Sequence, residues 1–450
     1  IMDHALKMDD EMTYFPRNTF DQCVDFIVSD CQYGIDGALP MIYTNASGTV
    51  AESLYGRATK AAAYALKARV LLYAASPLFN GNADYAKFAN EDGTLLFAPK
   101  DDSKWGKAAA AAKEAIDKIE GSSYYGLYYS DEPDNGYRNY MELFLPSKKW
   151  NKEYIFARNQ GTGYSDNIHQ EKCMAANGMG GWSGLCPTQE LVDAYEMANG
   201  STPIIGYNAD GTPIINGASG YSETGFAATA GKHYPAGVYN MYVGREPRFY
   251  ASINFNGQQW RGRQLEFWQG GKDGINVSKV DYCCTGYLLR KTADEGVDVI
   301  NGKGGMKEAS ILFRVGSLYL DYAEALNEAE GPVDDVYKYV DAIRKRAGLP
   351  GLAKGLDKDK MRERIQHERQ IELAFEAGHR YFDCHRWKIA EKTDNGYMHG
   401  MNITATNKVD YSKRSTVGDS RVFEKKHYLF PIPQSEMDKR IGLVQSPYWE

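Results

Sequence analysis

The first third of the chain carries hydrophobic residues at the spacing of amphipathic helices. Between residues 19 and 35 the apolar side chains recur at intervals of three and four, at Phe20, Cys23, Val24, Ile27 and Cys31. The segment 57–79 is rich in strong helix formers and meets Pro77, and 105–119 continues the pattern with small residues. Dense alanine lets neighbouring helices approach closely. The pattern therefore predicts tetratricopeptide-like helix pairs, although a strict 34-residue repeat is not readable.

Between about residues 161 and 308 the sequence becomes rich in glycine and aromatic residues, with short strand-like runs. Examples are GMGGWSG, RFYASINF and QLEFWQGG. A stretch of this length with little regular structure is uncommon in a compact chain, and such stretches usually have a function. We expect this region to form the binding face.

Helical periodicity returns after residue 308. It predicts helices over 311–331, 334–349 and 368–387 and then an extended run, 427–440, interrupted by two prolines. No low-complexity linker divides the chain, which favours one domain, 1–450, of mainly α class with a loop-rich, short-strand-containing face. We assign its parts as a helical scaffold (1–160 and 309–390), a binding region (161–308) and an extended C-terminal segment (391–450).

The segment 368-ERQIELAFEAGHRYFDCHRW-387 concentrates carboxylates, histidines and a thiol. Such groups at helical spacing could form a catalytic site, but that requires paired carboxylates on a cleft. The alternative is a scaffold helix with an apolar stripe at Ile371, Ala374, Phe375 and Gly378. Beside the stripe runs a ladder of Glu368, Glu372 and Glu376, close enough to pair with Arg364, Arg369 and Arg380. We favour the scaffold helix.

Charge and cysteine content narrow the function classes. A net charge of −7 without a basic cluster argues against a nucleic-acid partner. The sequence contains no run of 18 apolar residues, so it predicts no membrane-spanning helix. No signal peptide is visible, and the absence of an initial Met leads us to expect a processed or truncated fragment. Seven cysteines without a C-x-x-C pair predict neither a zinc ribbon nor a redox motif and leave the disulfide state open.

Aromatic residues make up 13% of the chain, with 33 tyrosines, which is typical of surfaces that stack on flat ligands or form interfaces. Three tryptophans of the glycine-rich region lie among amide and guanidinium side chains. An indole face stacks on the C–H face of a sugar while such polar groups meet its hydroxyls. The candidate carbohydrate-binding residues are Trp182, Trp260, Trp268, Asn256 and Arg263, with Tyr164 and His169 as weaker candidates.

Catalytic and metal templates are matched only in part. His367-Glu368 begins an H-E-x-x-H motif, but Ile371 occupies the second histidine position. GWSGL at 181–185 lacks the last glycine of G-x-S-x-G, and NADGT at 208–212 lacks the later glutamate of a calcium loop. No catalytic residue, metal or cofactor is therefore predicted.

Nine segments together resemble the SusD/RagB family of outer-membrane, glycan-binding lipoproteins, and they occur in that family's order over nearly the whole chain. They are 16-PRNTFDQCVDFIVSD-30, 56-GRATKAAAYALKARVLLYAASPLFNG-81, 187-PTQELVDAYEMANG-200, 246-EPRFYASINFNGQQW-260, 286-GYLLRK-291, 318-LYLDYAEALNEAEG-331, 343-IRKRAGLP-350, 368-ERQIELAFEAGHRYFDCHRW-387 and 429-LFPIPQSEM-437.

The resemblance implies a non-enzymatic protein that binds oligosaccharide at the cell surface. It also implies a partner, a SusC-like TonB-dependent outer-membrane transporter to which the glycan is delivered. Members of the family begin with a lipoprotein signal and an acylated cysteine. Membrane attachment is therefore expected only through a lipid anchor on an N-terminal portion outside this sequence. Ligand contacts vary among members, so the resemblance assigns no binding residue.

Two alternatives belong to other classes. A glycoside hydrolase also uses a loop-rich aromatic cleft, but it needs two carboxylates about 5–10 Å apart across the sugar. Near the tryptophans, Glu266 and Asp273 are the closest acids in sequence. The third hypothesis is a helical-repeat scaffold that binds only protein or peptide. A release of reducing sugar, or a lack of any glycan binding, would distinguish these alternatives from a glycan-binding protein.

Overall fold

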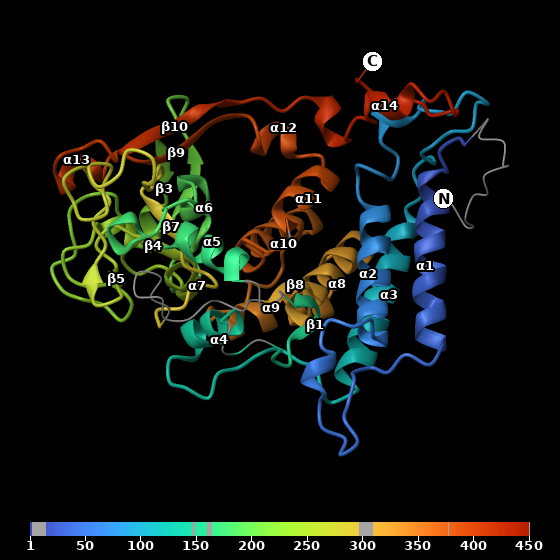
Figure 1. The fold of residues 1–450 in the computed structure, drawn as a ribbon, viewed down its shortest axis with the longest axis horizontal. Helices are drawn as coiled ribbons and strands as arrows, with labels where there is room; N and C mark the ends of the chain where they lie inside the picture. The colour runs from blue at the N-terminus through green and yellow to red at the C-terminus, as the bar shows by residue number, and fades with distance from the viewer. Residues whose placement is uncertain are drawn as a thin grey trace.

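The computed structural model describes residues 1, 15–145, 148, 150–159, 164–296, 309–376 and 378–449. Long helices form one half of the molecule, and short two-stranded sheets with long loops form the other (Figure 1). The predicted class, mainly helical with a loop-rich, short-stranded part, is confirmed.

The helices of the N-terminal part begin and end at local sequence signals. Thr19 and Gln22 form a reciprocal capping box at the start of the first helix. Thr59 accepts a hydrogen bond from Ala62 N at the start of the second, which ends two residues before Pro77 because proline cannot continue it. The helices are α1 (Phe20–Asp36), α2 (Lys60–Ala75), α3 (Ser103–Glu120) and α4 (Asn135–Leu143). The first three confirm the helices predicted from periodicity.

Alanine determines how closely these helices pack. Helix α2 lies between α1 and α3, and α3 also packs on α8 (Val315–Glu330) (Figure 1). The facing alanines are almost completely buried in one core, at Ala61, Ala65, Ala68, Ala108, Ala112 and Ala115. Small side chains at the crossings allow the close helix pairs that the sequence predicts.

The segment before α8 departs from the prediction. Residues Ala309–Arg314 form strand β8, which pairs antiparallel with β1 (Tyr154–Asn159), and the helix begins only at Val315. The prediction of a helix from residue 311 is therefore wrong by four residues. A short apolar run such as ILF fits strand or helix, and the edge offered by β1 decides for the strand.

The segment 368–387 is not one helix. Helix α10 (Lys358–Glu372) ends in a turn, and α11 (His379–Arg386) begins after it. Phe375 and Gly378 in the turn have φ of 63° and 72°, values that no α-helix contains. The prediction of a continuous helix is wrong because the turn is used in the core, where carbonyl groups freed from the helix accept hydrogen bonds from Lys291.

The glutamates of this segment do form ion pairs, but with arginines of other elements. Glu368 is paired with Arg248 and Arg344, and Glu372 with Arg248, Arg314 and Arg346. Arg314 also contacts Glu376, which in addition pairs with Lys291. We call this set the buried ion cluster: Glu368, Glu372, Glu376, Arg248, Arg314, Arg344, Arg346 and Lys291. All of its side chains are almost inaccessible to solvent.

The arginines predicted as partners from the same segment lie elsewhere. Arg364 pairs with Glu196, and Arg369 pairs with Asp321 and Asp383. Arg380 lines a surface hollow. The predicted pairing within the ladder is therefore wrong. The cluster instead joins α10 to α9 (Asp334–Arg346), to β8 and to the loop-rich half.

The loop-rich half has its own core, built from aromatic residues of short elements. Its helices are α5 (Tyr164–Met174), α6 (Gln189–Ala194) and α7 (Pro247–Ser252). Its strands are β2 (Ile204–Tyr207), β3 (Pro213–Ile215), β4 (Ile253–Phe255), β5 (Gln259–Trp260), β6 (Arg263–Gln264) and β7 (Tyr287–Leu289). They pair only in twos, β2 with β3, β4 with β7 and β5 with β6. The proposed limits of the binding region, 161–308, remain a prediction.

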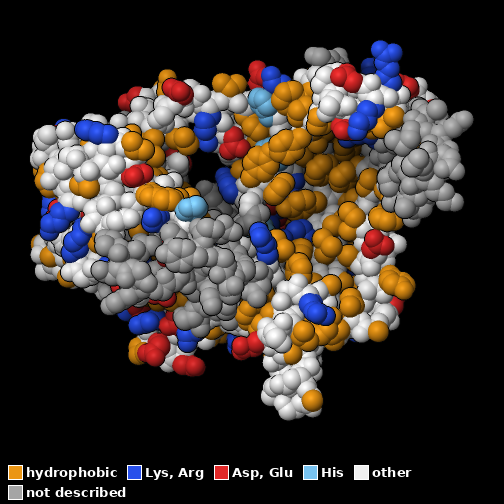
Figure 2. All heavy atoms as spheres, in the orientation of Figure 1, with side chains coloured by type: hydrophobic (Ala, Val, Ile, Leu, Met, Phe, Trp, Pro, Cys, Tyr) orange, Lys and Arg blue, Asp and Glu red, His pale blue; other side chains and the backbone are white. Residues whose placement is uncertain are grey.

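The C-terminal segment returns across the molecule. It contains α12 (Ala390–Thr393), β9 (Gly396–Met401), α13 (Lys408–Tyr411), β10 (Arg414–Arg421) and α14 (Gln434–Met437). The β9–β10 hairpin extends from the helical half to the loop-rich half (Figure 1), where His399 N donates to Glu190 of α6. Apolar side chains gather on the surface of the helical half (Figure 2). Among the described residues, no helix has the length and apolarity needed to cross a membrane.

The buried histidine of α11 predicts how stability depends on pH. His379 is 5% exposed, and burial, with the nearby Arg69 and Arg369, lowers its pKa to about 3. Below about pH 6.5 His379 binds a proton in the unfolded chain but not in the folded protein, so the stability falls as the pH falls. Above that pH, His379 does not affect the stability. Denaturant titrations should show His379 contributing a loss of about 2 kcal/mol between pH 6.5 and pH 5.

The matched variants are His379→Gln, which should reduce this slope, and His169→Gln at an exposed position of α5 (Tyr164–Met174), which should keep it. Burial would raise the pKa of Glu376, but pairing with Arg314 and Lys291 outweighs it and lowers the pKa to about 2. Glu376 therefore changes the stability only below about pH 4.5. The window from pH 5 to 6.5 is therefore free of it. An unchanged slope in His379→Gln would contradict the assignment.

Candidate functional site

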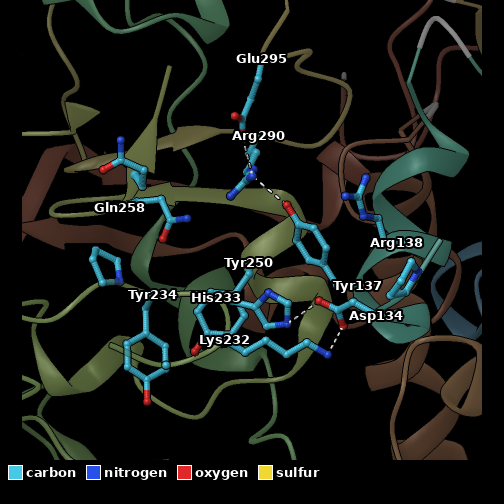
Figure 3. Close-up of a pocket in the computed structure, with 14 residues that line it drawn as sticks. Asp134, Tyr137, Arg138, Lys232, His233, Tyr234, Tyr250, Gln258, Arg290 and Glu295 are labelled. Carbon is cyan, nitrogen blue, oxygen red and sulfur yellow. Dashed lines mark hydrogen bonds and ion pairs between the residues drawn. The ribbon is translucent and has the colours of Figure 1, made fainter. Parts of the chain in front are cut away.

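A hollow of about 500 Å³ opens where the start of α4 meets the loop-rich half (Figure 3). This volume is within the range of small-ligand sites. Its lining residues come from five separate segments, namely Pro133, Asp134, Tyr137, Arg138, Gly231, Lys232, His233, Tyr234, Pro235, Tyr250, Gln258, Gln259, Arg290 and Glu295. We call it the α4 hollow.

Flat rings follow one another along the α4 hollow. The ring of Tyr137 stacks on His233 at a centroid distance of 4.7 Å, and His233 lies 5.2 Å from the ring of Tyr250. Tyr234 stacks on Tyr250 at 6.1 Å. Except for Tyr250, these rings are only half-buried. Such a row offers apolar faces with polar edges, which suits a ligand that is flat on one side and hydroxylated at its rim.

Asp134 holds the loop 231–235 against α4. Its φ of 73° is in the left-handed region, an uncommon conformation that lets its carbonyl oxygen accept hydrogen bonds from the first turn of the helix. Its carboxylate pairs with Lys232 Nζ at 2.6 Å and His233 Nε2 at 3.3 Å (Figure 3). Burial lowers the pKa of His233, with Lys232 and Arg290 adding to the shift against Asp134. The imidazole is therefore neutral at pH 7 and can donate or accept a hydrogen bond.

Arg290 links the α4 hollow to a second one. Its Nη2 donates to the hydroxyl of Tyr137 at 2.7 Å and to Glu295 Oε1 at 2.9 Å (Figure 3). Its guanidinium also lies 4.9 Å from the ring centre of Trp260. Trp260 and Arg290 line the adjoining hollow, of about 280 Å³. Arg290 therefore lies between the row of rings in the α4 hollow and the indole of Trp260.

Gln258 lines the α4 hollow and contains an unused hydrogen-bonding group. The residue is 5% exposed, and its Oε1 has no hydrogen-bond partner among the described residues. Its backbone is held in place between β4 and β5 by bonds to Phe255 and Leu265. A buried acceptor without a partner costs free energy, and a ligand hydroxyl that reached it would recover that cost.

Because the oxygen of Gln258 has no partner, its removal is predicted to affect stability and ligand binding in opposite directions. Gln258→Met keeps the side-chain length but removes the buried polar atoms. The free protein should become as stable as, or slightly more stable than, the wild type, whereas binding of the ligand should weaken about tenfold, the loss of one hydrogen bond worth about 1.4 kcal/mol. Thermal unfolding with and without ligand measures both. Gln434→Met, at an exposed position of α14 that does not line the hollow, is the control. Equal binding by wild type and Gln258→Met would refute the role.

Of the tryptophans predicted from sequence, Trp260 borders this region. A two-residue turn with Arg261 and Gly262 at φ of 45° and 83° joins β5 to β6 and pairs Trp260 with Arg263. The indole is 2% exposed and belongs to the aromatic core. It lines the adjoining hollow next to Arg290.

The other two tryptophans have different surroundings. Trp182 is half-buried, 5.2 Å from the ring of His169 and 4.9 Å from Lys172 Nζ, so two of the predicted residues do meet there. Trp268 packs against the aromatic core, and its buried Nε1 has no partner among the described residues. No ring contact joins any of the three indoles, all of which the structure describes.

The remaining predicted residues hold the loops. Asn256 Oδ1 accepts from Phe267 N at 2.9 Å, and Arg263 forms a two-bond pair with Asp273 at 2.7 and 2.6 Å. Tyr164 begins α5, and its side chain is outside the described residues. Carbohydrate contact by the seven predicted residues remains a prediction.

Sequence reasoning missed most of the α4 hollow. Asp134, Tyr137 and Arg138 are in the part assigned to the scaffold, and 231–235 is a loop that carried no motif. The available signal was 231-GKHYP-235, where a cation, an imidazole and a phenol stand between glycine and proline. Gln258 and Gln259 are among the amide side chains near Trp260, and no sequence pattern distinguishes them from the others.

A further hollow, of about 430 Å³, lies among the scaffold helices and includes Trp105 and Trp387. Several of its polar groups already have partners. Arg362 pairs with Glu328, and Trp387 Nε1 donates to Glu324 at 2.7 Å. The α4 hollow is the better candidate because it combines stacked rings with a buried acceptor that lacks a partner.

Fold and hollow together define a class, a helical-scaffold protein that presents an aromatic, polar hollow on a loop-rich face. The profile of the SusD family matches residues 146–449, and the chain belongs to that family.

Relatives agree with the assignment. The chain is 42% identical over 82 residues to SusD-like protein P25 of Formosa agariphila, and 29% identical over 154 residues to SusD-like protein P2 of the same organism. These matches cover 18% and 32% of this chain but only 15% and 26% of those proteins.

Solved structures cover the whole chain. A protein named BT4246 superposes with a TM-score of 0.82 at 28% identity, over 100% of this chain and 80% of that one. A SusD-like protein from Bacteroides fragilis gives 0.70 at 27% identity, over 100% and 75%.

Proposed function

We propose that this protein binds an oligosaccharide in the α4 hollow without cleaving it. The observation that carries the proposal is the row of rings at Tyr137, His233 and Tyr234 beside the buried, unpartnered oxygen of Gln258. Pyranose rings offer C–H faces for stacking and hydroxyls for single acceptors. Membership of the SusD family supports the same ligand class.

Hydrolysis fits the hollow less well. Its two carboxylates are each engaged with a cation, Asp134 with Lys232 and Glu295 with Arg290. A glycosidase needs a carboxyl group that can give its proton to the glycosidic oxygen, whereas both carboxylates here are occupied by a cation. Binding is therefore the activity we propose, with no cofactor required.

We further propose that the bound glycan is delivered at the cell surface to a TonB-dependent outer-membrane transporter of the SusC type, with this protein attached to the outer membrane as a lipoprotein. The support is the order of the nine family-like segments and the apolar surface of the helical half (Figure 2), which suits a protein partner. Copurification with such a transporter from detergent-solubilised outer membranes tests this part.

Affinity electrophoresis and calorimetry against a panel of neutral and acidic polysaccharides test the binding. Slowed migration with at least one glycan, together with no increase in reducing ends after prolonged incubation, is the expected result. Release of reducing sugar would establish the hydrolase alternative. Unchanged migration with every glycan, together with binding of peptides, would favour the protein-binding scaffold.

A further inference from the structure

Three cysteines that are far apart in sequence meet in the loop-rich half. The sulfur of Cys186 lies 3.9 Å from that of Cys283, 97 residues further along the chain. The thiol of the neighbouring Cys284 is close enough to that of Cys186 for each to raise or lower the pKa of the other. Cys186 is thus the shared neighbour of two adjacent thiols.

The two segments are already held together by other bonds. Leu289 N donates to the carbonyl of Leu185 at 2.9 Å, and the hydroxyl of Tyr287 donates to Gln189 Oε1 at 2.6 Å. Closing the sulfurs from 3.9 Å to bonding distance requires a movement of about 2 Å. Side-chain rotation and small loop shifts supply that movement without separating the segments.

The three thiols differ in access. Cys284 is exposed, Cys186 is half-buried at the edge of a surface hollow of about 360 Å³, and Cys283 is buried with its sulfur directed to the carbonyl of Tyr287. An oxidant therefore meets Cys284 first. In the part of the chain that the structure describes, no three His, Cys, Asp or Glu side chains are arranged to hold a metal ion. Covalent pairing is the chemistry left to this cluster.

We infer that this cluster is a disulfide site, at which Cys186 becomes bonded to the Cys283–Cys284 pair when the protein meets a disulfide oxidant. The Cys284 thiolate attacks the oxidant, displaces one of its thiols and forms a mixed disulfide. The Cys186 thiolate then attacks the sulfur of Cys284 and displaces the second thiol. Attack of Cys283 on Cys186 transfers the bond inward and returns Cys284 to a free thiol.

The reaction balances with the oxidant's own disulfide. Two protein thiols lose two electrons and two protons, and one disulfide of the oxidant becomes two thiols. The hydrogen bond with Cys283, followed by burial, raises the pKa of Cys186, and the hydrogen bond with Cys186 and burial raise that of Cys284. Thiolates are therefore scarce at neutral pH, so we expect slow formation. The same groups leave poorly as thiolates, so the bond should persist once made.

The bond would brace a segment that leads into the binding face. It joins Cys186, three residues before α6, to the segment that leads through β7 into Arg290, which lines both hollows. The inference does not depend on glycan binding, since it concerns only the three thiols. Oxidising compartments outside the cytoplasm are where such a bond is maintained.

The test uses the purified chain in a buffer of oxidised and reduced glutathione, followed by acid quenching, alkylation and peptide mass mapping. Of the seven cysteines, two should escape alkylation, in a cross-linked peptide pair that contains Cys186 and the 283–284 segment. In Cys186→Ser the cross-link should disappear, whereas Cys23→Ser on α1 should retain it. Alkylation of all seven thiols, a bond within Cys283–Cys284, or a bond from Cys186 to nearby Cys173 would overturn the inference.

Discussion

Glu372→Gln is expected to cost the protein about 3–5 kcal/mol of unfolding free energy, the largest effect of any single substitution considered. Glu372 is fully buried and pairs with Arg248, Arg314 and Arg346. A neutral amide keeps the volume but leaves several guanidinium groups in the core with one negative charge fewer. Breaking such a cluster is costly because the remaining charges have no water to solvate them. Urea titration of the purified variant measures the loss.

The matched control is Glu114→Gln. Glu114 is 42% exposed and lies 3.4 Å from Lys67, so its removal should change stability by less than about 1 kcal/mol. If Glu372→Gln is too unstable to purify, its midpoint can be read in cell lysate by pulse proteolysis beside the wild type. A midpoint equal to that of the wild type would show that the cluster does not hold the two halves together.

Tyr137→Ala is expected to weaken glycan binding at least tenfold, and Tyr137→Ala combined with Tyr234→Ala about a hundredfold, since each tenfold step is about 1.4 kcal/mol. The first substitution removes a stacking face and also releases Arg290, whose Nη2 lies 2.7 Å from the Tyr137 hydroxyl. Aromatic and arginine anchors carry most of the energy in binding sites. Calorimetry with the best glycan of the panel gives the dissociation constants.

Two further variants separate stacking from hydrogen bonding and one site from another. Tyr137→Phe keeps the ring and should lose less affinity than Tyr137→Ala. Trp182→Ala removes the predicted tryptophan that stands next to His169. We expect it to bind like the wild type. A large loss in Trp182→Ala with none in Tyr137→Ala would move the site to the tryptophans predicted from sequence.

The helices show how far local pattern reaches. Helices α1, α2 and α3 follow from spacing, caps and a proline, all of which act within a few residues. The run 311–314 could not be settled in this way, because its strand form depends on β1, which begins at Tyr154. Periodicity records which side chains share a face but not which edge or helix that face will meet.

The glutamate-rich segment separates the two levels most clearly. Sequence showed that Glu368, Glu372 and Glu376 needed cations, and the nearest arginines were the obvious partners. The structure places those glutamates in the core against cations from α7, β8, α9 and the segment after β7, including Arg248 and Arg346. Burial selects partners by three-dimensional position, since a buried charge has to be neutralised by whatever side chain the fold brings within reach.

The sequence by itself determined the helical scaffold, the family and the class of ligand to be tested, because these rest on local periodicity and on motifs in a fixed order. Only the tertiary structure decided where the candidate site lies. Tyr137, His233, Gln258 and Arg290 are separated by up to 153 residues and carry no shared motif. They form one hollow because the buried ion cluster and the short strand pairs bring their backbones together, and that convergence has no trace in the order of residues.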